Sequence, residues 1–178
     1  MVHRFLDYLS VERQYSELTV SAYGDDLRHF ADFLGVEVDD LDLNTLSSAD
    51  VQSWMIEMLD RGQSPRSVKR RLSSLRSYAK YCLRVGLTTS DITQKVIAPK
   101  MQKPLPVFYK ESEMKAEHVM LEHADDFLSK RNALIIEMLY QTGMRRAELL
   151  RLTDADVDLN QMQVRVFGKR RKERIVPF

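Results

Sequence analysis

The chain has 178 residues, 44% hydrophobic and 30% charged, with one cysteine and a formal net charge of +1. One thiol excludes an internal disulfide framework, and the lack of a Cys-x-x-Cys or Cys/His cluster excludes a zinc finger. No run approaches the roughly 18 to 20 apolar residues of a membrane span, and charges stand where a signal peptide has its apolar core, so we expect a cytoplasmic protein with no membrane partner.

Four helices are predicted in the first hundred residues. The first covers about 2–13 and places Phe5, Leu6, Leu9 and Val11 on one side. Cap residues and glycine stops delimit the next three, which are expected over about 18–34, from Ser47 or Ser48 to Gly62, and over 65–85.

The fourth helix has two contrasting faces. It begins with Ser64 as cap and Pro65 at the first helical position. Its predicted buried stripe is Val68, Leu72, Leu75, Ala79 and Cys82. Bases lie mostly off this stripe, with Ser73 and Ser77 among them, and both residue types donate to phosphate oxygens. These bases are Arg66, Lys69, Arg70, Arg76, Lys80 and Arg84.

The second part of the chain begins after a basic, proline-containing segment, 98–110, that is predicted to be a linker. Helices are expected over about 111–122 and 126–141, and the second is apolar on nearly every side, which predicts a place in a core. A break at Thr142-Gly143 leads to a short helix. Beyond a polar turn, strands are expected at 163–167 and 174–178, joined by a turn.

The net charge of +1 conceals a strong division along the chain. Residues 1–60 carry a net charge of −10, 61–110 carry +11, 111–164 carry −5 and 165–178 carry +5. Two basic segments in a nearly neutral protein indicate a polyanion partner touched at particular surfaces. Lys and Arg that merely solvate helices are the alternative, and charge alone does not decide between the two.

Three residues of the second part have side chains suited to phosphate chemistry. Arg145 precedes Glu148 by three positions on one helix face, and a guanidinium held by a carboxylate matches two oxygens of a phosphate. Lys169 follows Gly168 at the hairpin tip and is placed to act as a general acid. From the residues alone, an ordinary ion pair and a solvated turn are the more common explanations.

Four segments, in the right order, resemble the tyrosine site-specific recombinases, or phage integrase family, and most of all the bacterial Xer-type recombinases. TGMRRAELLRL (142–152) resembles the family's first-arginine motif, and VFGKRRKERIVPF (166–178) resembles its catalytic hairpin. ELTVSAYGDDLRHFADFL (17–34) and SPRSVKRRLSSLRSYAKYCL (64–83) resemble the second and fourth helices of its core-binding domain.

The resemblance implies a mainly α fold: a four-helix, SAM-like core-binding domain over 1–97, the linker, and the α+β start of a catalytic domain with a β-hairpin over 111–178. Arg145 then matches the arginine that clamps the scissile phosphate, Glu148 its acidic support and Lys169 the hairpin lysine. Thr19, Tyr23, Ser73 and Arg76 match positions placed against DNA. We expect further DNA contacts from Arg66, Lys69, Arg70, Lys80, Lys100 and Lys103.

The family's activity is DNA cleavage and rejoining through a 3′-phosphotyrosine, without metal or other cofactor, in a tetramer that holds two double-stranded recombination sites. Its second arginine in a His-x-x-Arg motif and its tyrosine nucleophile follow the hairpin. Here all four histidines and all seven tyrosines precede Arg145. We therefore expect the amino-terminal part of a recombinase that binds DNA and lacks the nucleophile. A natural short regulator that binds DNA without cutting it is the alternative, and a helical protein-interaction module is a weaker one.

Overall fold

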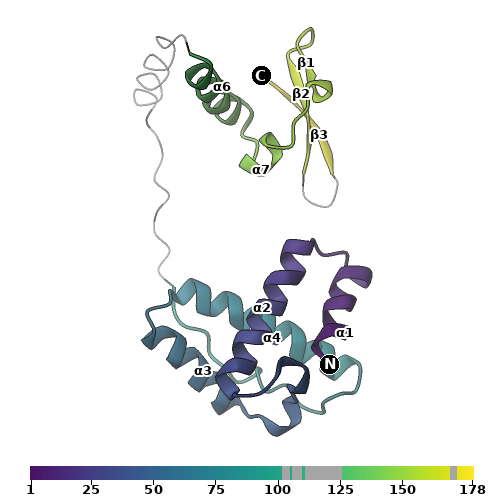
Figure 1. Ribbon diagram of the computed structural model, residues 1–178, viewed down its shortest axis with the longest axis vertical. Coiled ribbons are helices and arrows are strands. Elements are labelled where there is room, and N and C mark those ends of the chain that lie inside the picture. The colour runs from purple at the N-terminus through teal and green to yellow at the C-terminus, as the bar shows by residue number, and fades with distance from the viewer. Residues whose placement is uncertain (102–104, 106–109, 111–125, 169–171) are drawn as a thin grey trace. The chain divides into compact units, whose positions relative to one another are not determined.

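The computed structural model describes residues 1–101, 105, 110, 126–168 and 172–178 (Figure 1). The chain divides into two compact units, Met1–Pro104 and Leu105–Phe178, each of which is described by itself. The predicted helix over 111–122 and much of the predicted linker lie outside the described residues. Among those described, no helix is both long and apolar enough to cross a membrane.

Unit 1 is helical, as the sequence predicts. Its elements are α1 (Val2–Asp7), a π-helix (Tyr8–Glu12), α2 (Glu17–Leu34), 3₁₀ turns at Val38–Asp40 and Leu43–Thr45, α3 (Ser48–Asp60) and α4 (Pro65–Arg84). The caps act as expected, because the Ser16 and Ser64 hydroxyls accept from backbone N–H groups three residues on. Gly35 ends α2 at φ 70°.

The predicted stripe of α4 forms the centre of unit 1. Its five residues are each at most 3% exposed, and Phe5, Phe30 and Trp54 from other helices lie in the same core. The chain after α4 returns to this core through Ile92 and Val96. The period of α4 therefore identified its buried face correctly.

The first helix differs from its prediction beyond Asp7. The Arg13 N–H donates to the Tyr8 carbonyl at 3.0 Å, five residues back, so the turn is a π-turn. Val11, which is predicted to lie on the same side as Phe5 and Leu9, is 75% exposed. Two residues turn an α-helix by about 200°, so Val11 lies on the side opposite Leu9, and the prediction for Val11 was wrong.

Asp26 of α2 joins this helix to α4 from a buried position. It is 2% exposed and accepts hydrogen bonds from Nη1 and Nη2 of Arg70 and from the Ser74 hydroxyl, each at 2.6 Å. Arg71 Nε lies 3.7 Å from the same carboxylate. One acid of the acidic first sixty residues is thus a structural contact to the basic helix.

Unit 2 places two described helices beside a small antiparallel sheet. Its elements are α6 (Phe127–Thr142), α7 (Arg146–Leu149), a 3₁₀ turn (Asp154–Asp156), β1 (Val157–Asp158), β2 (Gln163–Phe167) and β3 (Glu173–Pro177). The strand order is β1-β2-β3, and Val164 pairs with Val176 and Val166 with Arg174. Sequence predicts the hairpin to within one residue, whereas β1 lies in the stretch predicted as a polar turn.

The prediction that α6 lies in a core was wrong for the described residues. No residue of α6 is fully buried, and Leu134 and Tyr140 are 62% and 60% exposed. The core of unit 2 consists of Met144, Val164 and Val166, with partly buried neighbours that include Met138 and Leu139. This core is too small to cover all sides of α6.

Candidate functional site

The end of α6 fixes the position of Arg145. Gly143 ends the helix at φ 58°, in the left-handed region that favours glycine. Met144 is 4% exposed and anchors the chain in the core of unit 2. Arg145 then takes an extended conformation as the N-cap of α7, and its side chain is 72% exposed. The guanidinium therefore faces solvent from a firmly held backbone.

Glu148 lies at the centre of a cluster of two arginines. Its carboxylate accepts from the backbone N–H of Arg145 at 2.8 Å and from Nη1 of Arg145 at 2.8 Å. It also accepts from Nη1 and Nη2 of Arg174 at 3.2 and 2.8 Å. Since Glu148 is only 7% exposed, its two oxygens are oriented by four donors in a nearly dry position.

The cluster carries two fixed positive charges and one negative charge. Hydrogen bonds from Arg174, followed by those from Arg145, lower the pKa of Glu148 to about 2. Glu148 in turn raises the pKa of Arg174. Glu148 is therefore a carboxylate at neutral pH, and two guanidinium groups beside this one carboxylate give a net charge of +1, which favours an anion beside Arg145.

Sequence reasoning missed Arg174. The pairing of Val166 with Arg174 places this residue on the same sheet face as Val164 and Val176, towards the core. An arginine at an inward position of an alternating strand needs a carboxylate partner. That signal was present in the sequence, but the partner Glu148 lies 26 residues away.

Lys169 lies outside the described residues, but its neighbour Gly168 borders the arginine cluster. A Cβ atom at Gly168 would lie 3.4 Å from Oε1 of Glu148 and 3.3 Å from Nη1 of Arg174. The Gly168 N–H donates to the Lys172 carbonyl at 2.7 Å. The base of the hairpin loop therefore lies beside Glu148.

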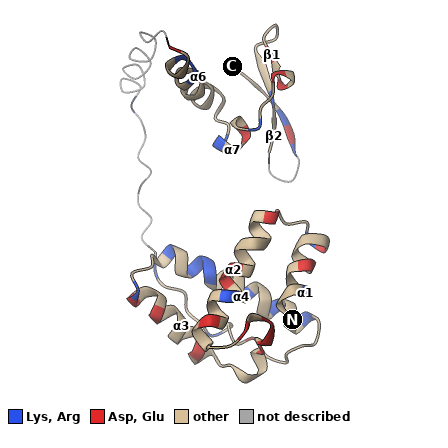
Figure 2. Cartoon of the chain, viewed as in Figure 1, with Lys and Arg blue, Asp and Glu red and all other residues tan. Residues whose placement is uncertain are grey.

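Lys and Arg residues lie along α4 (Figure 2). Five of the bases predicted to contact DNA are on this helix, and they fall into two groups. Arg66, Lys69 and Lys80 are exposed, and no ion pair joins them to another residue that the structure describes. Arg70 instead uses both terminal nitrogens on Asp26, and Arg76 donates to the Val96 carbonyl at 2.7 Å. The first group is available to a partner, whereas the second also holds the fold together.

The remaining predicted contacts lie at several places. Thr19 is at the start of α2 and hydrogen-bonds the Ser16 hydroxyl at 2.8 Å. Tyr23 packs against the core, with its ring centroid 6.2 Å from that of Phe5. The Ser73 hydroxyl donates to the Lys69 carbonyl at 2.9 Å. Lys100 is exposed, and Lys103 lies outside the described residues.

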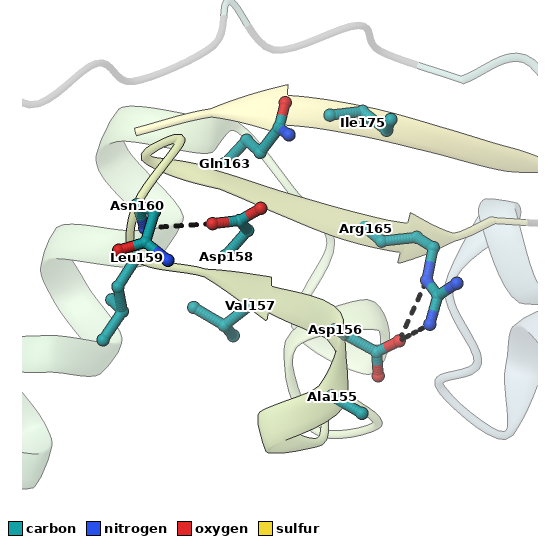
Figure 3. Close-up of a pocket in the computed structure, with 9 residues that line it drawn as sticks. All are labelled: Ala155, Asp156, Val157, Asp158, Leu159, Asn160, Gln163, Arg165 and Ile175. Atoms are coloured by element: carbon teal, nitrogen blue, oxygen red, sulfur yellow. Dashed lines mark hydrogen bonds and ion pairs between the residues drawn. The ribbon is translucent and has the colours of Figure 1, made fainter.

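A hollow of about 490 Å³ in unit 2 is lined by residues of the 3₁₀ turn and of all three strands (Figure 3). Arg165 and Ile175, which line it, alternate with the core-facing residues of β2 and β3. Its two carboxylates are already paired: Asp156 with Arg165 at 3.2 Å, and Asp158 with backbone N–H groups. No set of three or more His, Cys, Asp or Glu among the described residues is placed to hold a metal ion.

Comparison with known proteins identifies the class to which this fold belongs. The model of the phage integrase N-terminal SAM-like domain matches residues 2–86, and that of the phage integrase family matches residues 112–178. The chain belongs to this family, the tyrosine recombinases. Its mainly helical SAM-like domain, followed by a partial catalytic domain with an antiparallel sheet, confirms the fold predicted from the sequence.

Similar curated proteins include the bacterial tyrosine recombinases XerC. Tyrosine recombinase XerC of Bacillus pumilus (strain SAFR-032) is 36% identical over 178 residues, which are 100% of this chain and 58% of the relative. XerC of Staphylococcus aureus (strain bovine RF122 / ET3-1) is 37% identical over 174 residues, which are 98% of this chain and 57% of the relative. The chain thus spans less than two thirds of these relatives.

Solved structures with this fold include two of lambda integrase. A lambda integrase tetramer bound to a Holliday junction matches with a TM-score of 0.75 and 16% identity over 99% of this chain and 49% of that one. A lambda integrase dimer bound to a COC′ core site matches with a TM-score of 0.72 and 18% identity over 99% of this chain and 47% of that one. At these identities the likeness concerns the fold.

Proposed function

We propose that this chain is the DNA-binding part and the beginning of the catalytic part of a site-specific DNA recombinase. In this proposal unit 1, over about 1–97, holds double-stranded DNA through α2 and α4, and the basic segment 98–110 follows the backbone. Residues 111–178 supply part of the active site. The observation that carries the proposal is the exposed basic face of α4 in a chain of this family.

In unit 2, Arg145 is proposed to clamp the phosphate at which a strand is cut. Its backbone N–H and one guanidinium nitrogen are bonded to Glu148, which leaves the other terminal nitrogen to donate to a phosphate oxygen. Glu148 and Arg174 are positioning residues in this scheme. Lys169, next to Gly168, is proposed to reach the same phosphate and to protonate the leaving 5′-oxygen.

The complete reaction needs a tyrosine nucleophile that follows the hairpin in this family, and all seven tyrosines of these 178 residues precede Arg145. In the proposed scheme, a tyrosine beyond Arg174 attacks the phosphate and forms a 3′-phosphotyrosine while the 5′-hydroxyl leaves. The 178-residue chain is therefore proposed to bind DNA without forming this bond. The complete protein is proposed to act as a tetramer on two sites, as the lambda integrase complex suggests, on DNA in the bacterial cytoplasm.

Duplex binding by charge-matched variants tests the DNA-binding proposal. One variant combines Arg66→Gln, Lys69→Gln and Lys80→Gln, which removes three exposed bases of α4 that make no ion pair with another described residue. Its control combines three exposed bases that lie outside α2 and α4: Arg4→Gln, Arg61→Gln and Lys95→Gln. Anisotropy of a labelled short duplex should show affinity at least about tenfold weaker for the α4 variant than for the control, from two or more lost charge contacts. Equal affinities of the two variants would contradict the proposal.

Covalent attachment is tested separately on a denaturing gel. The chain is incubated with nicked suicide duplexes that carry recombination sites of the relatives. We expect no protein–DNA adduct from the 178-residue chain, and an adduct once the chain is fused to the remaining part of a XerC relative. In the fusion, Arg145→Ala should lower the rate of adduct formation by about 10²–10³-fold. An adduct formed by the 178 residues alone would overturn the assignment of the nucleophile.

A further inference from the structure

A hollow of about 240 Å³ on unit 1 combines aromatic and basic side chains. It lies between the π-helix with the turn that follows it and the second half of α4. Three of its lining residues are tyrosines, three are bases, and no described lining residue is acidic. These six residues define what we call the tyrosine–arginine pocket: Tyr8, Arg13, Tyr15, Lys80, Tyr81 and Arg84.

Arg84 is held in this pocket by aromatic groups instead of a carboxylate. Its Nη1 donates to the Tyr8 hydroxyl at 2.7 Å, and its Cζ lies 4.0 Å from the centroid of the Tyr8 ring and 5.6 Å from that of Tyr81. Such contacts orient a guanidinium without neutralising it. The charge of Arg84 and its other N–H donors therefore stay available to an anion.

The backbone on the other side of the pocket has two uncommon conformations. The π-turn places Arg13 next to Tyr8, and Gln14 follows with φ 51°, in the left-handed region. The Tyr15 N–H then donates to the Leu9 carbonyl at 3.0 Å, which brings Tyr15 back to the pocket. A hydrogen bond with Tyr15, and a nearby Tyr8, raise the pKa of Arg13. Conformations of this kind cost energy and cluster at functional sites.

The size and chemistry of the pocket restrict its ligand. Its volume is below the roughly 300–1,000 Å³ of sites for drug-sized ligands, so it suits a small group. Three cations and several hydroxyl donors without a carboxylate suit the oxygens of a phosphate. The pocket also adjoins the predicted DNA face, because Lys80 lies on α4 and the Tyr15 ring is 6.2 Å from that of Tyr23.

We propose that the tyrosine–arginine pocket binds one phosphate group of the DNA backbone, with Arg13, Lys80 and Arg84 as its charged ligands. The inference rests on the proposed binding of double-stranded DNA and adds a contact site that includes the end of the first helical segment. Tyr8 and Tyr81 orient Arg84, and the Tyr15 hydroxyl lies beside Arg13. The pocket would thereby fix the register of unit 1 along the duplex.

The salt dependence of duplex binding tests this site. The variant combines Arg13→Gln and Arg84→Gln, and its control combines Arg4→Gln and Arg61→Gln, which remove the same charge elsewhere on unit 1. The slope of log affinity against log salt should be smaller by about 0.9 in the pocket variant than in the control, the value for one phosphate contact. The conservative pair Arg13→Lys and Arg84→Lys should retain the slope of the wild type. Thermal melting followed by circular dichroism checks that each variant is folded.

The possible outcomes separate this inference from the proposed function. If the wild type binds duplex with a steep salt dependence but the pocket variant matches its control, the inference fails and the DNA-binding proposal stands. If the wild type does not bind duplex, both fail. A second titration uses inorganic phosphate and monitors amide chemical shifts by NMR. It tests whether the pocket binds a free anion instead of a DNA phosphate. Saturable shifts at Arg13 and Arg84 with inorganic phosphate, and none with duplex, would assign the pocket to a free anion and overturn the inference.

Discussion

Replacing Asp26 by asparagine is expected to destabilise unit 1 strongly. The asparagine keeps nearly the same shape, but it removes the negative charge that Arg70 contacts with two nitrogens at 2.6 Å. Nε of Arg71, 3.7 Å from the same carboxylate, is buried and without a hydrogen-bond partner among the described residues. Two guanidinium groups thus lose the charge that lies between them.

The structure sets the size of this effect. Removing one partner of a buried ion pair costs about 3–5 kcal/mol when the other charge remains buried. The side chain of Arg70 is 53% exposed, so water partly replaces the lost contact. We therefore expect a loss of about 2–3 kcal/mol in the free energy of unfolding. For a unit of about one hundred residues, the midpoint temperature would fall by about 10–20 °C.

Urea unfolding followed by tryptophan fluorescence measures this loss in unit 1 alone. Trp54 is the single tryptophan of the chain and is 1% exposed in the core of unit 1. The matched control is Asp25→Asn, on the same helix, whose pair with Arg28 is exposed on both sides and should contribute less than about 1 kcal/mol. Equal free energies of unfolding for the two variants would refute the role given to Asp26.

Three further outcomes are expected. Unit 2 should lose stability as the pH falls from 4.5, the ordinary pKa of a glutamate, towards about 2, because folded Glu148 stays ionised while the unfolded chain binds a proton. Amide exchange in β2 measures this stability, and its loss on lowering the pH should be smaller in Glu148→Gln than in the wild type. The same pH dependence in both proteins would contradict this. Unit 1 should lose stability as the pH falls below 6.5, because burial lowers the pKa of His29, whose Nδ1 accepts from Trp54 at 3.0 Å. Trp54 fluorescence in urea should show a weaker pH dependence in His29→Gln, and an equal one would count against the assignment. Gly143→Ala should cost unit 2 about 1–2 kcal/mol, since φ is 58°. Calorimetry checks this value, and no loss would show that the turn relaxes.

Local signals made most of the fold predictable. Ser16, Ser64 and the glycines that end helices act within a few residues of their positions, and the stripe of α4 follows one period. The same reasoning failed at Val11, because a residue two positions after Leu9 lies on the opposite side of an α-helix. It also assumed one helix type over 2–13, whereas a π-helix covers Tyr8–Glu12.

The candidate site was predictable only in part, because its contacts join distant segments. Arg145 and Glu148 lie three residues apart, so their pairing follows from helix geometry. Arg174 reaches Glu148 across 26 residues, and Arg70 reaches Asp26 across 44. Charge pairs at such separations depend on tertiary packing. Sequence reasoning therefore placed Arg70 among the DNA contacts without its structural partner.

The salt dependence of duplex affinity for the wild-type chain tests the central proposal, that its basic surfaces bind the phosphates of double-stranded DNA. Anisotropy of a labelled duplex is measured over a series of salt concentrations at constant pH. The proposal predicts a linear fall of log affinity with log salt, with a slope of about 0.9 for each phosphate contact and several contacts in all. An affinity that does not change across the series, or no binding at the lowest salt, would contradict it.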